Sequence, residues 1–134
     1  MLQDLVAKFV DGQLMPLEPK IIAREIAGGH PALTAEEEAP LLARCKELGL
    51  WALDAPEEFG GANLPVLALM PVFEELWRTI VPFILPPDSP NLHLLKAVAT
   101  PEQKKMYLEP YARAARPRAP WRSPSPAPVQ THPA

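Results

Sequence analysis

The stretch LGLWALDAPEEFGGANLP, residues 48–65, divides the sequence into two parts. It contains the glycines Gly49, Gly60 and Gly61 and the prolines Pro56 and Pro65. Residues of these two types interrupt both helices and central strands. The stretch therefore predicts an irregular connection, and the fold class depends on the patterns on each side of it.

The residues before this connection show helical periodicity. The first apolar set is Leu2, Leu5, Val6, Phe9 and Val10, at the spacing of an amphipathic helix. Pro16 and Pro19 punctuate that helix, and Pro19 suits the first turn of a second short helix. The sequence GGHP at residues 28–31 then predicts a break.

A further helix is predicted to begin near Thr34. Thr34 and Glu37 have the spacing of a capping box, and Gly49 suits the C-terminal cap. The predicted buried stripe is Leu41, Leu42, Cys45 and Leu48. Pro40 removes a backbone donor inside this helix, so its first turn lies either at Thr34 or nearer Pro40.

The residues after the connection are also helical in pattern. A helix from about Pro65 is predicted to be kinked at Pro71. Its apolar face comprises Val66, Leu69, Met70, Phe73, Leu76, Trp77 and Ile80. A rigid apolar connection, VPFILPPDSPN, leads to a short helix that carries Leu92, Leu95 and Val98. Thr100, Pro101 and Gln103 then open a last helix. The fold class predicted is all-α, a helical bundle of five or six short helices over residues 1–113.

Composition fits one globular domain. The chain has 134 residues, 48% of them hydrophobic and 22% charged, and its net charge of −3 gives no electrostatic case for binding nucleic acid or an anionic membrane. No apolar run approaches the roughly 20 residues that span a bilayer. Asp4 and Lys8 interrupt the first apolar residues, which argues against a signal peptide. A single cysteine, Cys45, excludes an internal disulfide and favours a reducing compartment, so we expect a cytoplasmic protein. We separately expect a bacterial source.

No residue pattern points directly to chemistry. The three histidines have no cysteine or carboxylate at helical spacing, so no metal ligands are predicted. Cys45 lies on an apolar stripe and is interpreted as a core residue. His93 is interpreted as a histidine at the edge of the core rather than a catalytic group. Glu74 and Glu75 leave two alternatives: one is a buried, paired acid, or both belong to a solvated face.

Three segments, in order, resemble the flavin-dependent acyl-CoA dehydrogenases. ELGLWALDAPEEFGG, residues 47–61, is similar to the family's Leu-Gly-Leu/Trp, spacer, Pro-x-x-Phe/Tyr-Gly-Gly segment. VFEELWR, residues 72–78, is similar to the next helix of the family's N-terminal domain. ATPEQKKMYLEPYARA, residues 99–114, is similar to its Gly-Thr-x-x-Gln-Lys-x-x-Tyr-Leu signature. This chain departs from the family in Ala99 and Ala114, where glycine is usual, and in the extra prolines Pro40 and Pro71.

The resemblance implies an α,β-desaturation of acyl-CoA thioesters. In that family a glutamate removes the α-proton, FAD accepts the β-hydride, and a homo-oligomer passes electrons to an electron-transfer flavoprotein. The glutamate and most flavin contacts come from later domains, so we expect no catalytic, cofactor-binding or metal residue here and no bound FAD. The family's acyl-chain pocket corresponds to residues 91–95, which implies Leu92 and Leu95 as chain contacts, with plain core packing as the alternative. We expect this chain to be an inactive fragment that self-associates.

The last residues, 114–134, change in character. Six of the 19 prolines lie between Pro117 and Pro133, and disorder is predicted from this composition. Codons allowed for residues 121–132, read one frame over, can spell Ala-Leu-Thr-Glu-Pro-Gly-Ala-Gly-Ser-Asp-Pro. That peptide resembles the first strand of the family's middle β domain, so we interpret the tail as an out-of-frame translation. The alternative is a small helical interaction module with a proline-rich tail that binds as a polyproline ligand.

Overall fold

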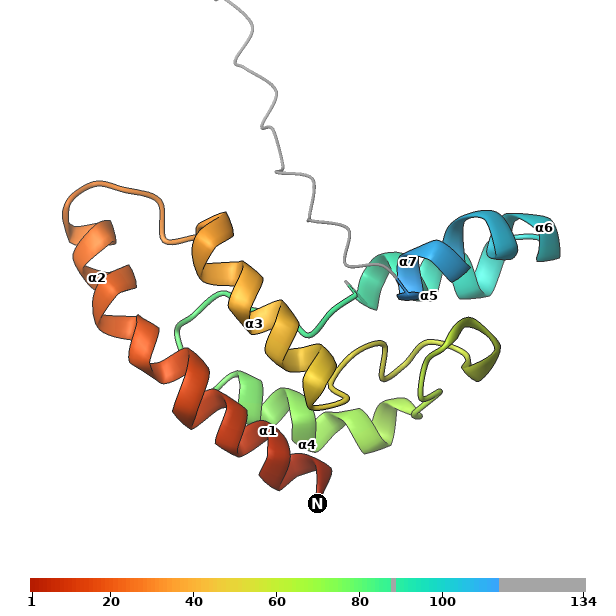
Figure 1. Cartoon of the computed structure of the whole chain (residues 1–134), viewed down its shortest axis with the longest axis horizontal. Coiled ribbons are helices and arrows are strands. Elements are labelled where there is room, and N and C mark those ends of the chain that lie inside the picture. Colours follow the sequence, from red (N-terminus) through yellow and green to blue (C-terminus); the bar gives the residue numbers. More distant parts are fainter. Residues whose placement is uncertain (88, 114–134) are drawn as a thin grey trace, which may run out of the picture.

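A computed structural model describes residues 1–87 and 89–113, except for the side chains of residues 89–92 and 111. The described part is helical and contains no strand (Figure 1). The all-α prediction is therefore confirmed. The predicted disordered tail, residues 114–134, lies outside the described residues.

The first half of the chain forms one long helical rod followed by an antiparallel helix. The rod runs through α1 (Leu2–Phe9), the π-helical η1 (Val10–Leu14), the 3₁₀ turn η2 (Met15–Leu17) and α2 (Glu18–Ile26). The residues at these junctions keep right-handed helical dihedrals, so Pro16 and Pro19 change the helix type without ending the rod. Pro19 lies in the first turn of α2, as predicted.

The helix α3 (Ala35–Glu47) begins and ends where its local signals predict. The Thr34 side chain accepts a hydrogen bond from the Glu37 amide at 3.3 Å, and the Glu37 carboxylate accepts one from the Thr34 amide at 2.9 Å. Gly49 follows the helix with a φ of +70°, a left-handed value that glycine adopts without strain. Pro40 is inside the helix, so the alternative start near Pro40 is wrong.

The connection between the two halves is irregular but tightly bonded to itself. It contains only the short 3₁₀ turn η3 (Glu57–Phe59). Backbone amides in its second part donate to carbonyls in its first: Ala62 to Ala52 at 3.1 Å and Asn63 to Ala55 at 2.8 Å, for example. The amide of Ala52 also donates to the Pro86 carbonyl at 2.8 Å. The loop 50–63 therefore folds into a compact unit that touches the later part of the chain.

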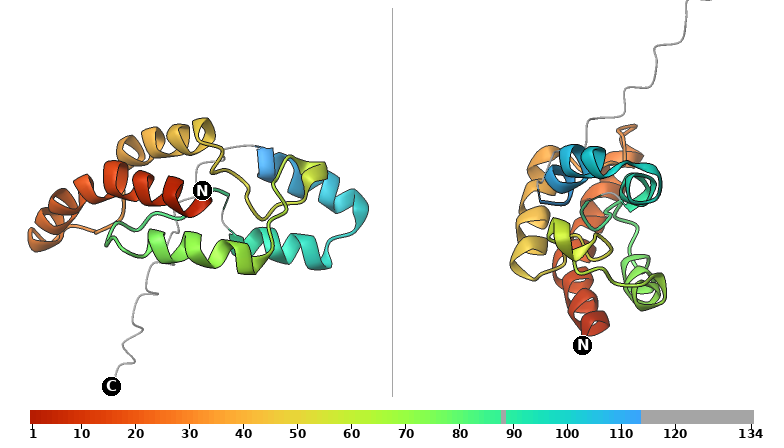
Figure 2. Two further views of the ribbon diagram at one scale, coloured as in Figure 1. Left: turned by 90° about the horizontal axis from the view of Figure 1, so that it is seen from below. Right: turned by 90° about the vertical axis from the view of Figure 1, so that its right-hand side faces the viewer.

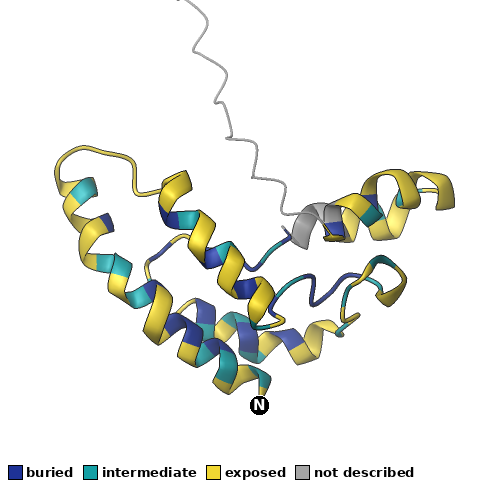
Figure 3. Ribbon diagram, in the orientation of Figure 1, coloured by how far each residue is buried: buried dark blue, intermediate teal, exposed yellow. Residues whose placement is uncertain are grey.

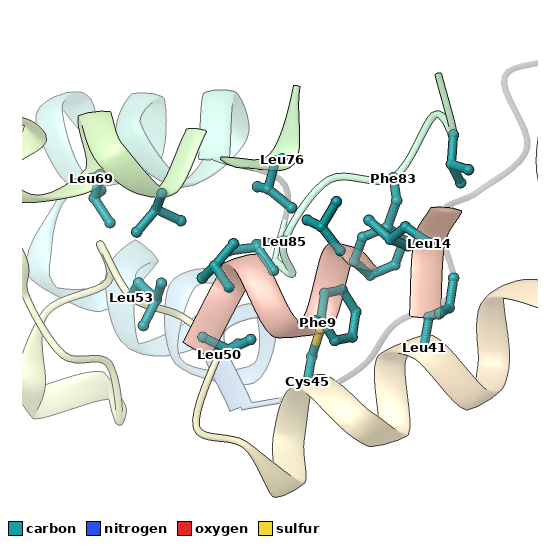
Figure 4. Close-up of a cluster of buried hydrophobic side chains, with 14 of the residues drawn as sticks. Phe9, Leu14, Leu41, Cys45, Leu50, Leu53, Leu69, Leu76, Phe83 and Leu85 are labelled. Carbon is teal, nitrogen blue, oxygen red and sulfur yellow. The ribbon is translucent and has the colours of Figure 1, made fainter. Parts of the chain in front are cut away.

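The main core lies between the rod, α3 and α4 (Val66–Leu76), with α4 packed on α1 (Figures 2 and 4). Phe9, Cys45 and Leu50 are among its fully buried side chains. The Phe9 and Phe83 rings pack at 5.7 Å between centroids. Burial of each such large apolar side chain is worth about 1.5–3 kcal/mol, so this cluster carries most of the fold's stability.

A smaller unit follows, made of α5 (Ser89–Val98), α6 (Pro101–Gln103), the π-helical η4 (Lys104–Leu108) and α7 (Glu109–Arg113). The predicted capping box of Thr100 and Gln103 is present. This C-terminal helical unit contacts the loop 50–63 through a second buried cluster of Ala52, Ala55, Leu108 and Ala112. In Figure 2, left, α4 and α5 follow each other along one side of the molecule.

The predicted apolar face after Pro65 was wrong in part. On α4 the buried residues are Leu69, Val72 and Leu76, and Figure 3 shows both buried and exposed stretches on this helix. Of the predicted face, Val66 and Met70 on the helix and Trp77 and Ile80 after it are exposed. The face turned towards α1 is thus shifted around the helix and includes Val72, which was not in the predicted face. The run 81–85, the start of the predicted apolar connection, buries Val81, Phe83 and Leu85 in alternation with exposed neighbours.

Candidate functional site

The candidate site is the junction between the loop 50–63 and the C-terminal helical unit, because the predicted chain contacts lie there. Leu92 and Leu95 are both on α5. Leu95 is half-buried and packs against the second cluster. The side chain of Leu92 lies outside the described residues. The role of these leucines as contacts for an acyl chain stays a prediction.

Trp51 ties the loop to the end of the C-terminal helical unit. Its indole Nε1 donates to the backbone carbonyl of Ala112 on α7 at 2.7 Å. The ammonium of Lys46 lies over the indole ring, 4.7 Å from the ring centroid. A buried indole normally finds a partner for its N–H, and here that partner belongs to the last described helix. The bond therefore reports whether the two parts are in contact.

Asp54 and His93 meet at the same junction. The Asp54 side chain is 8% exposed, and its Oδ2 lies 3.2 Å from Nε2 of His93, whose side chain is 49% exposed. Sequence reasoning placed His93 at the edge of the core but did not single out Asp54. Only tertiary structure brings these two residues together, because they belong to different elements and share no local spacing.

Other ionisable groups are engaged in structural contacts. Hydrogen bonds from Arg24, then from Lys20, lower the pKa of Glu37 to about 2, and these contacts join α2 to α3. Burial raises the pKa of the Cys45 thiol to about 12. Such a thiol is not a nucleophile at neutral pH, so the interpretation of Cys45 as a core residue is confirmed.

The two glutamates of α4 differ from each other. Glu74 is exposed, whereas Glu75 is half-buried. The Glu75 carboxylate accepts hydrogen bonds from Arg78 and Gln3, and that contact with Arg78 is the main cause of its lowered pKa. One of the pair is therefore a partnered acid that fastens α4 to α1, and neither is placed to serve as a base.

At the junction, the polar side chain left without a hydrogen-bond partner among the described residues is an acid rather than a donor that FAD could use. A bound dinucleotide needs donors for its diphosphate, usually backbone amides at a helix start. Here the buried polar atom without a hydrogen-bond partner is a carboxylate oxygen, Oδ2 of Asp54, which would repel that diphosphate. A depression of about 300 Å³ on the outer side of α3 is lined by Ala39, Leu42, Ala43 and Lys46, and it is open to solvent.

Two further classes of site were sought in the described part of the chain. No group of three histidine, cysteine or carboxylate residues there is arranged to hold a metal ion. Within residues 1–87 and 89–113, every helix is too short or too polar to span a lipid bilayer.

Comparisons with known proteins give a consistent result. The sequence profile described as "Acyl-CoA dehydrogenase, N-terminal domain" matches residues 1–115. The chain is also similar to the (R)-benzylsuccinyl-CoA dehydrogenase of Thauera aromatica, with 32% identity over 121 residues. That match covers 84% of this chain and 30% of the relative, so the chain spans about a third of the relative's length. No solved structure matches the chain.

Proposed function

The chain belongs to the acyl-CoA dehydrogenase family, and on that premise we propose that it represents the N-terminal helical domain of an FAD-dependent enzyme that desaturates acyl-CoA thioesters. The observation that carries the proposal is the family match over residues 1–115. The relative named above acts on a CoA thioester, as its name states, which supports the same substrate class. We place the protein in the bacterial cytoplasm, where such thioesters are metabolised.

The contribution of this domain to the substrate site is proposed to come from α5. Leu92 and Leu95 would line one side of the acyl-chain pocket. Leu95 is half-buried at the junction, so part of its side chain is free to contact an acyl chain, which supports this role. The complete enzyme would add its catalytic glutamate, its flavin, a homo-oligomeric partner and an electron-transfer flavoprotein.

The chain by itself is proposed to bind no flavin and to have no dehydrogenase activity. The Asp54 carboxylate at the junction, which would repel the diphosphate of FAD, supports this proposal. The test is to purify the chain, add FAD, and record its visible spectrum and its reduction of an electron acceptor with acyl-CoA thioesters. A colourless, inactive protein is expected, and a stoichiometric flavin spectrum would overturn the proposal.

Residues 114–134 are proposed to be an out-of-frame translation, and residues 1–113 to be the domain. The support is the hidden motif in the shifted reading of residues 121–132, which begins a few residues after the family match ends at residue 115. Sequencing the coding DNA tests this. A one-base correction near Arg113 should open a long frame with a middle β domain. If no such frame exists, the interaction module with a proline-rich tail becomes the better account.

Self-association of the chain is proposed from its exposed apolar side chains. Leu67 and Met70 on α4 are 85% and 50% exposed, and Trp77, directly after the helix, is 79% exposed. Contiguous apolar surface of more than a few hundred Å² is unusual on a monomer. Sedimentation velocity over a range of concentrations should show dimers or larger species, and the double change Met70→Gln and Trp77→Gln should shift the chain to monomer. Glu74→Gln, on an exposed position of the same helix, is the matched control. A wild-type chain that stays monomeric would contradict the proposal.

A further inference from the structure

The carboxylate of Asp54 is buried without full compensation. The residue is 6% exposed, and its Oδ2 has no hydrogen-bond partner among the described residues. A buried ionised carboxylate is unfavourable unless it is paired and hydrogen-bonded. The cationic partner nearest in the described structure is His93, with Nε2 at 3.2 Å from Oδ2. The distance suits a charged pair, although the geometry is not that of a formed hydrogen bond.

The two residues belong to the two parts of the molecule that meet at this junction. Asp54 lies in the loop 50–63, next to the buried Ala52 and Ala55. His93 lies on α5, which packs against η4 of the same C-terminal helical unit. The loop is held to this unit by an apolar cluster that is smaller than the main core, with Trp51, Phe59 and Leu95 packed against it, and by few polar contacts, such as the bond between Lys96 and Asn63 at 3.1 Å. One ion pair can therefore change the stability of the contact noticeably.

We propose that His93 and Asp54 form a pH-dependent latch between the loop 50–63 and the C-terminal helical unit. When the imidazole is protonated, its positive charge compensates the buried carboxylate and the unit stays docked. When the imidazole loses its proton, the carboxylate is left uncompensated, and docking weakens. Histidine is the side-chain type whose charge ordinarily changes between pH 5 and 8.

The other charged side chains of this junction do not titrate in the same range. They are Glu57 and Glu58 in η3, Lys96 on α5, Lys104 and Lys105 in η4, and Glu109 and Arg113 on α7. Glu109 and Arg113 pair with each other at 2.9 Å. Between about pH 5.5 and 7.5, carboxylates ordinarily stay ionised and lysines and arginines stay charged. A change in docking over that interval would therefore come from the imidazole.

The indole proton of Trp51 provides the measurement, because its partner is the Ala112 carbonyl on α7. Hydrogen exchange of this proton is followed by nuclear magnetic resonance in the full chain and expressed as protection relative to an unfolded peptide. Protection should fall by up to about fivefold between pH 5.5 and 7.5, the size expected for one partly exposed ion pair. His93→Gln and Asp54→Asn should each abolish this dependence. His93→Lys, which keeps a positive charge at every pH used, should give high protection that does not vary with pH.

His30→Gln is the matched control, since His30 lies in the turn before α3 and accepts a bond from the Ala32 amide. It should retain the wild-type pH profile. The proposal is overturned if the wild-type profile is flat, or if His93→Gln keeps the wild-type dependence. It is also overturned if His93→Lys lowers protection at pH 5.5 to the level of His93→Gln, because a merely steric role for the ring would then account for both variants.

Discussion

Replacing Gly61 by alanine should destabilise the domain strongly, because the loop 50–63 crosses itself at this residue. A Cβ added at Gly61 would lie 2.1 Å from the carbonyl oxygen of Ala55 and 2.5 Å from its Cβ. Carbon and carbonyl oxygen atoms ordinarily meet at about 3.3–3.6 Å. The obstacle is backbone rather than a flexible side chain, so the chain itself must move apart.

The cost follows from what that movement would break. The Ala55 carbonyl accepts the amide of Asn63 at 2.8 Å, and the Gly61 amide donates to the Pro56 carbonyl at 3.1 Å. Overpacking costs about 1–3 kcal/mol, and a lost hydrogen bond adds about 1 kcal/mol. We therefore expect Gly61→Ala to lower the free energy of unfolding by about 2–4 kcal/mol, a large share of the 5–15 kcal/mol usual for a domain.

Equilibrium unfolding in urea measures this change, with helix content followed by circular dichroism in the far ultraviolet. Gly12→Ala is the matched control, because it adds the same methyl group in η1, where nothing lies within 4 Å of the added Cβ. There alanine should stabilise the chain by about 0.5–1 kcal/mol. If Gly61→Ala unfolded at the same urea concentration as wild type, the described crossing of the loop would be incorrect.

Two further predictions concern titratable groups. Hydrogen bonds from Arg24 and Lys20 hold the pKa of Glu37 at about 2, below its usual 4.5, so the stability that Glu37 contributes is present above pH 4.5 and is lost as the pH falls towards 2. In Glu37→Gln, the part of the acid-dependent fall in thermal stability between about pH 6 and pH 2 that comes from Glu37 should be missing. An acid profile identical to that of wild type would contradict this prediction. Burial raises the pKa of the Cys45 thiol to about 12, so Cys45 should not react with iodoacetamide at about pH 8 in the native chain and should react once urea unfolds the chain. Mass spectrometry measures this labelling. Rapid labelling of the native chain would contradict the burial of Cys45.

Features set by residues close in sequence could be predicted. The capping boxes of Thr34 with Glu37 and of Thr100 with Gln103 each need only a span of four residues, and both are present. The left-handed Gly49 after α3 depends on the same local geometry. The irregular connection was predictable as well, because glycine and proline act through their own backbone restrictions.

Features that depend on contacts between distant elements could not be predicted. Residues 81–85 alternate between buried and exposed because Phe83 packs on Phe9, a residue far away in the sequence. The meeting of Asp54 with His93 requires the C-terminal helical unit to fold back on the loop 50–63. Neither contact leaves a periodic signal, since each partner is a single residue in an otherwise ordinary segment.

The helix α4 shows why a hydrophobic period alone does not determine which face is buried. Leu69, Val72 and Leu76 form one apolar stripe, and Val66, Met70 and Trp77 form a second on the neighbouring face. Either stripe could fill a core, and packing on α1 buries the first. The second is then left exposed, including a Trp77 ring stacked on Phe73 at 6.1 Å between centroids. A helix that needed only to pack on α1 would carry polar residues there. The excess apolar stripe is therefore the feature of α4 that most strongly favours a further partner, and the Met70 and Trp77 substitutions act on it without disturbing the stripe that holds the fold.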